Sequence, residues 1–263
     1  MAETLTMMTE RVDDLPWLLA QLARMGVQPL LDEHCPTHGH WVGLSLDWVP
    51  GIWLTQILSD ANHRLNHVDP WVEQRLHTLR RCTGPPVHPL DRRDERRAGV
   101  LEVLSQDAPW QAFEGALTPH VRRVYEWPPE RVRLDSTTAS GSWRVTEDGL
   151  CQCGHRKDHR PDLPPVTVML SVLDPLGWPG ATDIVPGHRA DDPLALPAIT
   201  RVRESVGRRG LLDVGDGQMA ALETRASLPA GGDFYVCPLA ARSHGRLTSW
   251  RTTGDPWPAA HSP

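Results

Sequence analysis

The hydrophobic residues of this chain change their spacing once, near Trp127-Pro128-Pro129, and this change constrains the fold more than any other feature. Before it, apolar residues recur at intervals of three and four, as they do from Leu15 to Met25, which is typical of amphipathic helices. After it, apolar residues alternate with polar ones or form short β-branched runs, which is typical of strands. We therefore expect a helical domain over residues 1–125 and an α/β domain over residues 128–239.

The second half predicts seven elements in the order β-β-β-α-β-α-β. The turn Asp174-Pro175-Leu176-Gly177 should join the second and third strands as a hairpin. A parallel crossover through the following helix would then make the first and fourth strands neighbours in a mixed sheet. The strands are expected near Arg131–Leu134, Val166–Leu173, Ala181–Val185, Leu211–Val214 and Phe234–Val236, and the helices near Pro193–Arg209 and Ala220–Leu228.

Two of these expected strands end on an aspartate. Asp135 closes the run Arg-Val-Arg-Leu-Asp, and Asp216 closes the run Leu-Leu-Asp-Val-Gly-Asp. An acid at the end of a buried strand is costly to desolvate, so it often binds a metal or transfers protons. Two convergent carboxylates suit Mg²⁺ or Mn²⁺, and a pair of such ions can serve phosphoryl transfer. The alternative is that each aspartate caps a turn or the helix that follows.

Four motifs, in this order along the chain, resemble insertion-sequence transposases of the DDE class, in the insertion-sequence-four superfamily. They are the segments RVRLDSTTASG, GHRKDHRPDLP, PGHRADDP and VGD, which begin at Arg131, Gly154, Pro186 and Val214. The resemblance extends to about Leu239 and includes the helical first half.

This resemblance implies an α/β fold class: a helical N-terminal domain, used for DNA binding or assembly, followed by an incomplete ribonuclease-H-like mixed sheet flanked by helices. It also implies that Asp135 and Asp216 are the first and second catalytic acids and metal ligands. Such enzymes use two divalent ions, Mg²⁺ or Mn²⁺, to hydrolyse a phosphodiester at a transposon end. They then join the freed 3′-hydroxyl to target DNA.

The family's third acid is a glutamate on a helix well beyond the strand Phe234–Val236, and this chain leaves the family pattern after Leu239. Glu223 lies too early to be that residue. Residues 240–263 have no periodicity, so we expect an irregular tail that arose by a frameshift, although an ordinary flexible terminus has the same pattern. The hypothesis is a C-terminally truncated transposase that is inactive, or nearly so, by itself; whether it acts as an enzyme stays open.

A basic loop follows the first acid. Its residues could contact DNA phosphates near the acids, or they could form an ordinary solvated loop. They are Arg156, Lys157, His159 and Arg160. The nearby Cys151-Gln-Cys153-Gly-His155 is spaced too tightly for a usual zinc site.

Composition limits the expected partners and cellular location of the chain. The net charge of −6 argues against a chain that is basic overall, although a local basic face can still follow phosphates. Five cysteines and no secretory segment favour a cytoplasmic location, and no apolar run reaches the roughly 20 residues of a membrane span. The expected partners are therefore DNA, a second copy of the chain or an intact transposase, and not a membrane.

Two other functions remain open from the sequence. The chain could be a non-catalytic DNA-binding or regulatory remnant that antagonises an intact transposase. It could also be an unrelated metal-dependent nuclease or phosphatase that completes its site with Asp183 or Glu223.

Overall fold

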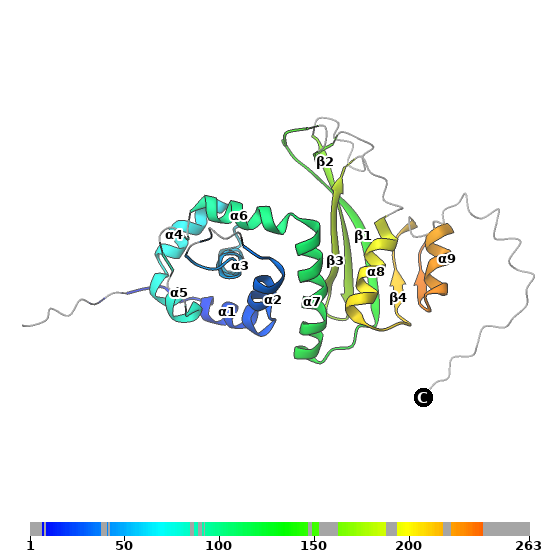
Figure 1. The fold of residues 1–263 in the computed structure, drawn as a ribbon, viewed down its shortest axis with the longest axis horizontal. Coiled ribbons are helices and arrows are strands. Elements are labelled where there is room, and N and C mark those ends of the chain that lie inside the picture. Colours follow the sequence, from blue (N-terminus) through cyan, green and yellow to red (C-terminus); the bar gives the residue numbers. More distant parts are fainter. Residues whose placement is uncertain are drawn as a thin grey trace, which may run out of the picture. The chain divides into compact units, whose positions relative to one another are not determined.

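The chain forms two compact units, Met1–Pro128 and Pro129–Pro263. The first is helical and the second is built on a sheet (Figure 1). The computed structural model describes residues 7, 9–37, 41, 43–84, 87–88, 91, 93–146, 149–152, 163–187, 194–217 and 222–238.

The first unit is a bundle of helices around one apolar core, as the helical spacing predicts. Leu15, Leu79 and Val100 are fully buried in this core. Gly26, with φ of 75°, joins the first two helices, and a Cβ there would lie 2.7 Å from Nε2 of His120. The helices are α1 Leu15–Arg24, α2 Val27–His34, α3 Trp48–Asp60, the 3₁₀ helix η1 Leu65–His67, α4 Val68–Glu73, α5 Leu76–Thr83, α6 Asp94–Leu104 and α7 Asp107–Tyr125.

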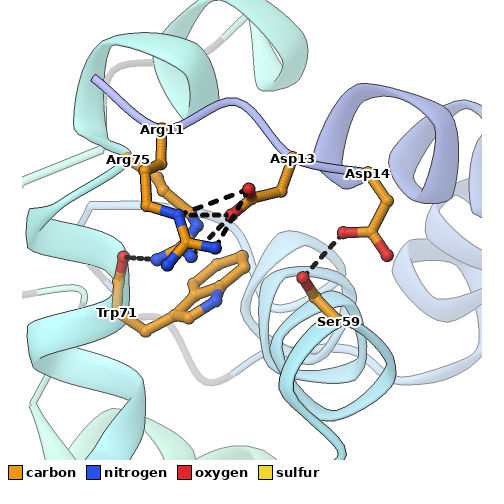
Figure 2. A network of polar contacts seen from close by, with 6 residues as sticks. All are labelled: Arg11, Asp13, Asp14, Ser59, Trp71 and Arg75. Carbon is orange, nitrogen blue, oxygen red and sulfur yellow. Dashed lines mark hydrogen bonds and ion pairs between the residues drawn. The ribbon is translucent and has the colours of Figure 1, made fainter. Parts of the chain in front are cut away.

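A buried arginine ties the segment before α1 to the junction of α4 and α5 (Figure 2). The side chain of Arg75 is 2% exposed; its Nη2 donates to Oδ2 of Asp13 at 2.8 Å, and its Nη1 donates to the carbonyl of Trp71 at 3.3 Å. The guanidinium carbon also lies 4.7 Å from the centroid of the Trp71 ring, which is cation–π geometry. Ser59 of α3 donates to Oδ1 of Asp14 at 2.6 Å, so the same short segment is held at two places.

Glu10 caps α5 from outside the helix. Its Oε1 accepts from the backbone N–H of His77 at 2.8 Å, and its Oε2 accepts from the N–H and the hydroxyl of Thr78, both at 2.7 Å. These are N–H groups that a helix cannot satisfy internally at its first turn. Burial opposes the ionisation of Glu10, but the hydrogen bonds from Thr78 and His77 outweigh it, and the pKa lies below its ordinary value of 4.5.

The second unit contains a five-stranded mixed sheet in the order β3-β2-β1-β4-β5. β2 pairs antiparallel with both β1 and β3, whereas β1, β4 and β5 run parallel. The predicted element order and the mixed sheet flanked by helices are confirmed. The elements are β1 Arg131–Ser140, β2 Pro165–Asp174, β3 Trp178–Pro186, α8 Ala195–Val206, β4 Leu212–Val214, α9 Leu222–Ala230 and β5 Phe234–Val236.

Both described helices of this unit pack on one face of the sheet. α8 lies against β2 and β3, and α9 lies against β5 and contacts α8. Leu173 of β2 and Ile199 of α8 are buried in the resulting core, and a Cβ on Gly180 would come within 3.3 Å of Val202, so the helix lies close to the sheet. None of the described helices combines the length and the apolar character that a bilayer crossing requires.

The mixed-charge segment around Arg96 and Arg97 has a pattern that is typical of a solvated helix face. The side chain of Arg97 is instead buried on α6, where it pairs with Asp94, and the guanidinium of Arg96 lies 4.3 Å from the centroid of the Trp41 ring. Aliphatic stems and planar guanidinium groups can pack against apolar surface, which charge patterns do not reveal.

Arg75 and Arg11 bind the same carboxylate at different depths, so they form a matched pair. We expect Arg75→Ala to lower the free energy of unfolding of the first unit by about 2–4 kcal/mol, because it removes a partly buried ion pair and the packing of the buried guanidinium on Trp71. Arg11→Ala, at a side chain that is 70% exposed, should cost less than about 1 kcal/mol. Urea unfolding followed by tryptophan fluorescence measures both, and equal losses would contradict the assigned role of Arg75.

The lowered pKa of Glu10 predicts a stability contribution that depends on pH. The contribution should be fully present above about pH 4.5 and should be lost as the pH falls through the lower pKa of the folded state. The difference in unfolding free energy between the wild type and Glu10→Gln should therefore be positive at pH 7 and should shrink toward zero on acidification. A difference that does not change with pH would show that the carboxylate charge plays no part in the cap.

Candidate functional site

Asp135 stands on β1 and Asp216 just beyond the neighbouring strand β4, and neither acid ends a buried strand. Asp135 lies in the middle of β1, its side chain is exposed, and the strand continues to Ser140 because the ladder with β2 runs on to the pair Ser140 and Pro165. Asp216 is also exposed and lies two residues beyond Val214, the last residue of β4. The expectation of buried strand-end acids is therefore wrong, since alternation turns these side chains away from the core.

The register of the parallel β1–β4 ladder determines the position of both acids along the strand direction. The last pair of this ladder is Arg133 and Val214, and two residues further along the two segments stand Asp135 and Asp216. Neighbouring strands lie about 4.8 Å apart. Alternation along β1 also puts Asp135 on the same side of the sheet as Arg133, which is opposite to the side that α8 covers.

This arrangement offers part of a cation site. Carboxylate oxygens are suitable ligands for Mg²⁺ or Mn²⁺, and exposed acids at one level of two adjacent strands can share an ion. Within the described part of the chain, no group of three or more histidine, cysteine or acidic side chains is placed to hold a metal. The acid pair thus fits a divalent ion in ligand type but provides an incomplete set.

The predicted basic loop lies outside the described residues. This applies to Arg156, Lys157, His159 and Arg160, and equally to Cys153 and His155 of the tight cysteine-histidine motif.

Asp183 and Glu223, which would complete the site of an unrelated nuclease or phosphatase, do not lie beside Asp135. Asp183 of β3 accepts two hydrogen bonds from Arg201 of α8, at 2.9 and 2.7 Å, and its ladder partner is the buried Met169. It therefore belongs to the helix-covered face, whereas Asp135 belongs to the other. Glu223 is exposed on α9, a helix of that covered face.

The sequence analysis missed Asp213, the acid that is buried in this region. It is 1% exposed in the centre of β4, between Val132 of β1 and Tyr235 of β5, and its Oδ2 has no hydrogen-bond partner among the described residues. Burial, helped by the charge of Asp233 and opposed by Arg203, raises the pKa of Asp213 to about 7. The signal was present, because alternation along Leu-Leu-Asp puts residue 213 on the same side as the buried Leu211.

Asp233, beside it, is buried but well satisfied. Its Oδ1 accepts from the backbone N–H groups of Gly210 at 2.7 Å and Leu211 at 3.1 Å, and its Oδ2 pairs with Nε of Arg203. This set of contacts joins α8, the start of β4 and the start of β5 at one end of the sheet.

Comparison with known proteins gives no family assignment. The sequence matches no protein-family model, and no curated protein matches it. Similar solved structures include the piggyBac transposase synaptic complex with hairpin DNA, at 10% identity and a TM-score of 0.41. That match covers 94% of this chain and 55% of the other, so the chain spans about half the length of that transposase.

Two further similar structures are of Mos1 transposase. The paired-end complex with the left transposon end has 8% identity and a TM-score of 0.30, and the match covers 94% of this chain and 92% of the other. The strand transfer complex has 10% identity and a TM-score of 0.28, with coverage of 93% and 84%. Superpositions of this quality do not by themselves relate the chain to these enzymes.

The raised pKa of Asp213 predicts that stability falls toward neutral pH. The folded state holds this proton up to about pH 7, whereas the unfolded state releases it near pH 3.8, so stability should decline as the pH rises between these values. Asp213→Asn keeps the shape and removes the charge, and it should raise the unfolding free energy at pH 8 by an amount on the order of a few kcal/mol. Thermal unfolding from pH 4 to 8 measures the effect.

The exposed acids provide the control for that experiment. Asp135→Asn makes the same substitution at an exposed side chain of the same sheet, so it should change the unfolding free energy at pH 8 by less than about 0.5 kcal/mol. A wild-type stability that stays flat from pH 4 to 8 would show that Asp213 is not buried as a neutral acid.

Proposed function

We propose that this chain is a fragment of a DDE-type insertion-sequence transposase, in which Asp135 and Asp216 are the first two catalytic acids. The observation that carries the proposal is the parallel pairing of β1 with β4. Asp135 and Asp216 each lie two residues after the last pair of this ladder, Arg133 and Val214, so they are at the same height along the strand direction. The ordered motifs around both acids, and the strand order β3-β2-β1-β4-β5, support the same reading.

Asp135 and Asp216 would hold Mg²⁺ or Mn²⁺, as two members of the ligand set of a two-metal site. When bound, such ions activate the attacking water and neutralise charge on the leaving oxygen of a phosphodiester. Asp135 would supply anionic oxygens from β1 and Asp216 from the segment just after β4, and the sheet sets the separation of the two strands.

We also propose that the chain binds DNA, namely transposon ends and target DNA. Residues 1–125 would serve DNA binding or assembly, and Arg156, Lys157, His159 and Arg160 would contact phosphates beside the acids. A second copy of the chain or an intact transposase would be the protein partner, in the cytoplasm.

We further propose that the chain alone carries out little or no cleavage or strand transfer. Supporting this, no third acid is placed beside the pair among the described residues, and Glu223 and Asp183 lie on the helix-covered side of the sheet. An assay on transposon-end DNA with Mg²⁺ or Mn²⁺ tests this, and normal turnover by the wild-type chain would overturn it.

Direct metal binding tests the two acids independently of turnover. We expect Mn²⁺ binding, followed by electron paramagnetic resonance, to weaken at least roughly tenfold in both Asp135→Asn and Asp216→Asn, because each substitution removes an anionic ligand. Asp183→Asn is the matched control, since it removes an acid of the same sheet that faces Arg201. Equal loss in all three variants, or no loss in the first two, would rule out the proposed site.

The incomplete acid set also favours a second candidate, a non-catalytic regulatory remnant that binds DNA and antagonises an intact transposase. Gel shifts with and without Mg²⁺, and mixing with an intact enzyme, separate the two. DNA binding that does not need the metal, together with inhibition of the intact enzyme, would favour the remnant.

A further inference from the structure

The sheet of the second unit has one face that none of the described helices covers. We call this the open face, and define it by Arg133, Asp135, Leu170, Ile184, Phe234 and Val236. The ladders put these residues on the side opposite to α8: Asp135 pairs with Leu170, and Val214 pairs with both Arg133 and Val236.

The open face exposes large apolar side chains on both sides of β1. Leu170 is 36% exposed and Ile184 is 55% exposed on the β2 and β3 side. Phe234 and Val236 are 68% and 57% exposed on the β5 side. Single exposed apolar residues are ordinary, but several on one face of a sheet mark an interaction surface. A sheet that is apolar on both faces is stable in water when both are covered.

The charges on this face are arranged in adjacent rows along β1. Arg133 precedes Asp135 by two residues on the same side, and Arg131 precedes Arg133 in the same way. Nε of Arg133 donates to Oδ1 of Asp174 at 3.1 Å, yet its side chain remains 56% exposed, so further guanidinium N–H groups face solvent. The positive row of Arg131 and Arg133, whose charge Asp174 of the same face offsets in part, therefore lies directly beside the negative row that contains Asp135.

We propose that the open face is a dimer interface, in which two copies of this chain pack their sheets face to face. A two-fold axis that runs across the strands, between the two charged rows, reverses the strand direction. It sets Arg133 over the partner's Asp135, and Asp135 over the partner's Arg133. The apolar flanks of β2 and β3, and of β4 and β5, then lie over the same strands of the other copy. A single face thus supplies both halves of a self-complementary interface, as two-fold symmetry requires.

This interface would engage Asp135, so in the dimer that carboxylate would not be available to the metal ion of the proposed function. The test reads molecular mass without DNA or divalent metal, so its outcome is separate from that of the metal-binding test. Sedimentation velocity over a concentration series should show a monomer–dimer equilibrium for the full chain. Phe234→Glu should raise the dimer dissociation constant at least roughly tenfold, since it puts a charge into the apolar flank. Leu176→Glu is the matched control, because Leu176 is similarly exposed (58%) but lies in the turn between β2 and β3, and it should leave the equilibrium unchanged.

A charge exchange tests the two-fold pairing itself. Arg133→Glu alone and Asp135→Lys alone should each weaken the dimer, because like charges then meet across the axis. An equimolar mixture of these two variants should restore it, since each copy then faces opposite charges. Thermal unfolding of each variant distinguishes a lost interface from a lost fold.

Three results would overturn the proposal. One is a wild-type chain that stays monomeric at the highest concentration. The second is equal disruption by Phe234→Glu and Leu176→Glu. The third is a failure of the charge-exchanged mixture to form dimers although both variants are folded.

Discussion

The parallel pairing of β1 with β4 organises the whole second unit. These strands are about 80 residues apart in sequence, and the antiparallel β2 and β3 and the helix α8 all lie between them along the chain. Once β4 lies beside β1, α8 must cross one face of the sheet, and β5 adds beyond β4. The same pairing determines the level of Asp216 relative to Asp135, so the fold and the candidate site depend on one set of backbone hydrogen bonds.

A buried polar cluster on the covered face makes this pairing specific. Asp233 binds the backbone at the start of β4 and pairs with Arg203 of α8, so it fixes where both the helix and the following strand begin. Asp213 lies next to it without a comparable set of partners. An apolar residue at position 213 would make the core more stable. β4 instead buries a titratable carboxyl group there, three residues before Asp216.

The order and type of the elements in the second unit could be predicted from the sequence because strand alternation and the Pro-Gly turns are local signals. The pairing of β1 with β4 followed from the handedness of the crossover. The exposure of Asp135 could not be derived, since an apolar run that ends on an acid looks the same whether the strand stops or continues into polar residues. Ser136 to Ser140 continue β1 only because β2 supplies a partner for each of them. The burial of Asp213 follows from alternation, which puts residue 213 on the same side as the buried Leu211.

The contacts of Glu10 and Asp13 bear on how the first unit can be shortened. These residues lie before the first helix, at positions that are commonly removed to make compact versions of a protein or joined directly to an affinity tag. Here the removal of about a dozen residues would take away the cap of α5 and the carboxylate that neutralises the buried Arg75, although both helices would remain intact in sequence. The functional boundary of this helical unit therefore lies before Glu10, several residues ahead of the point where its first helix begins.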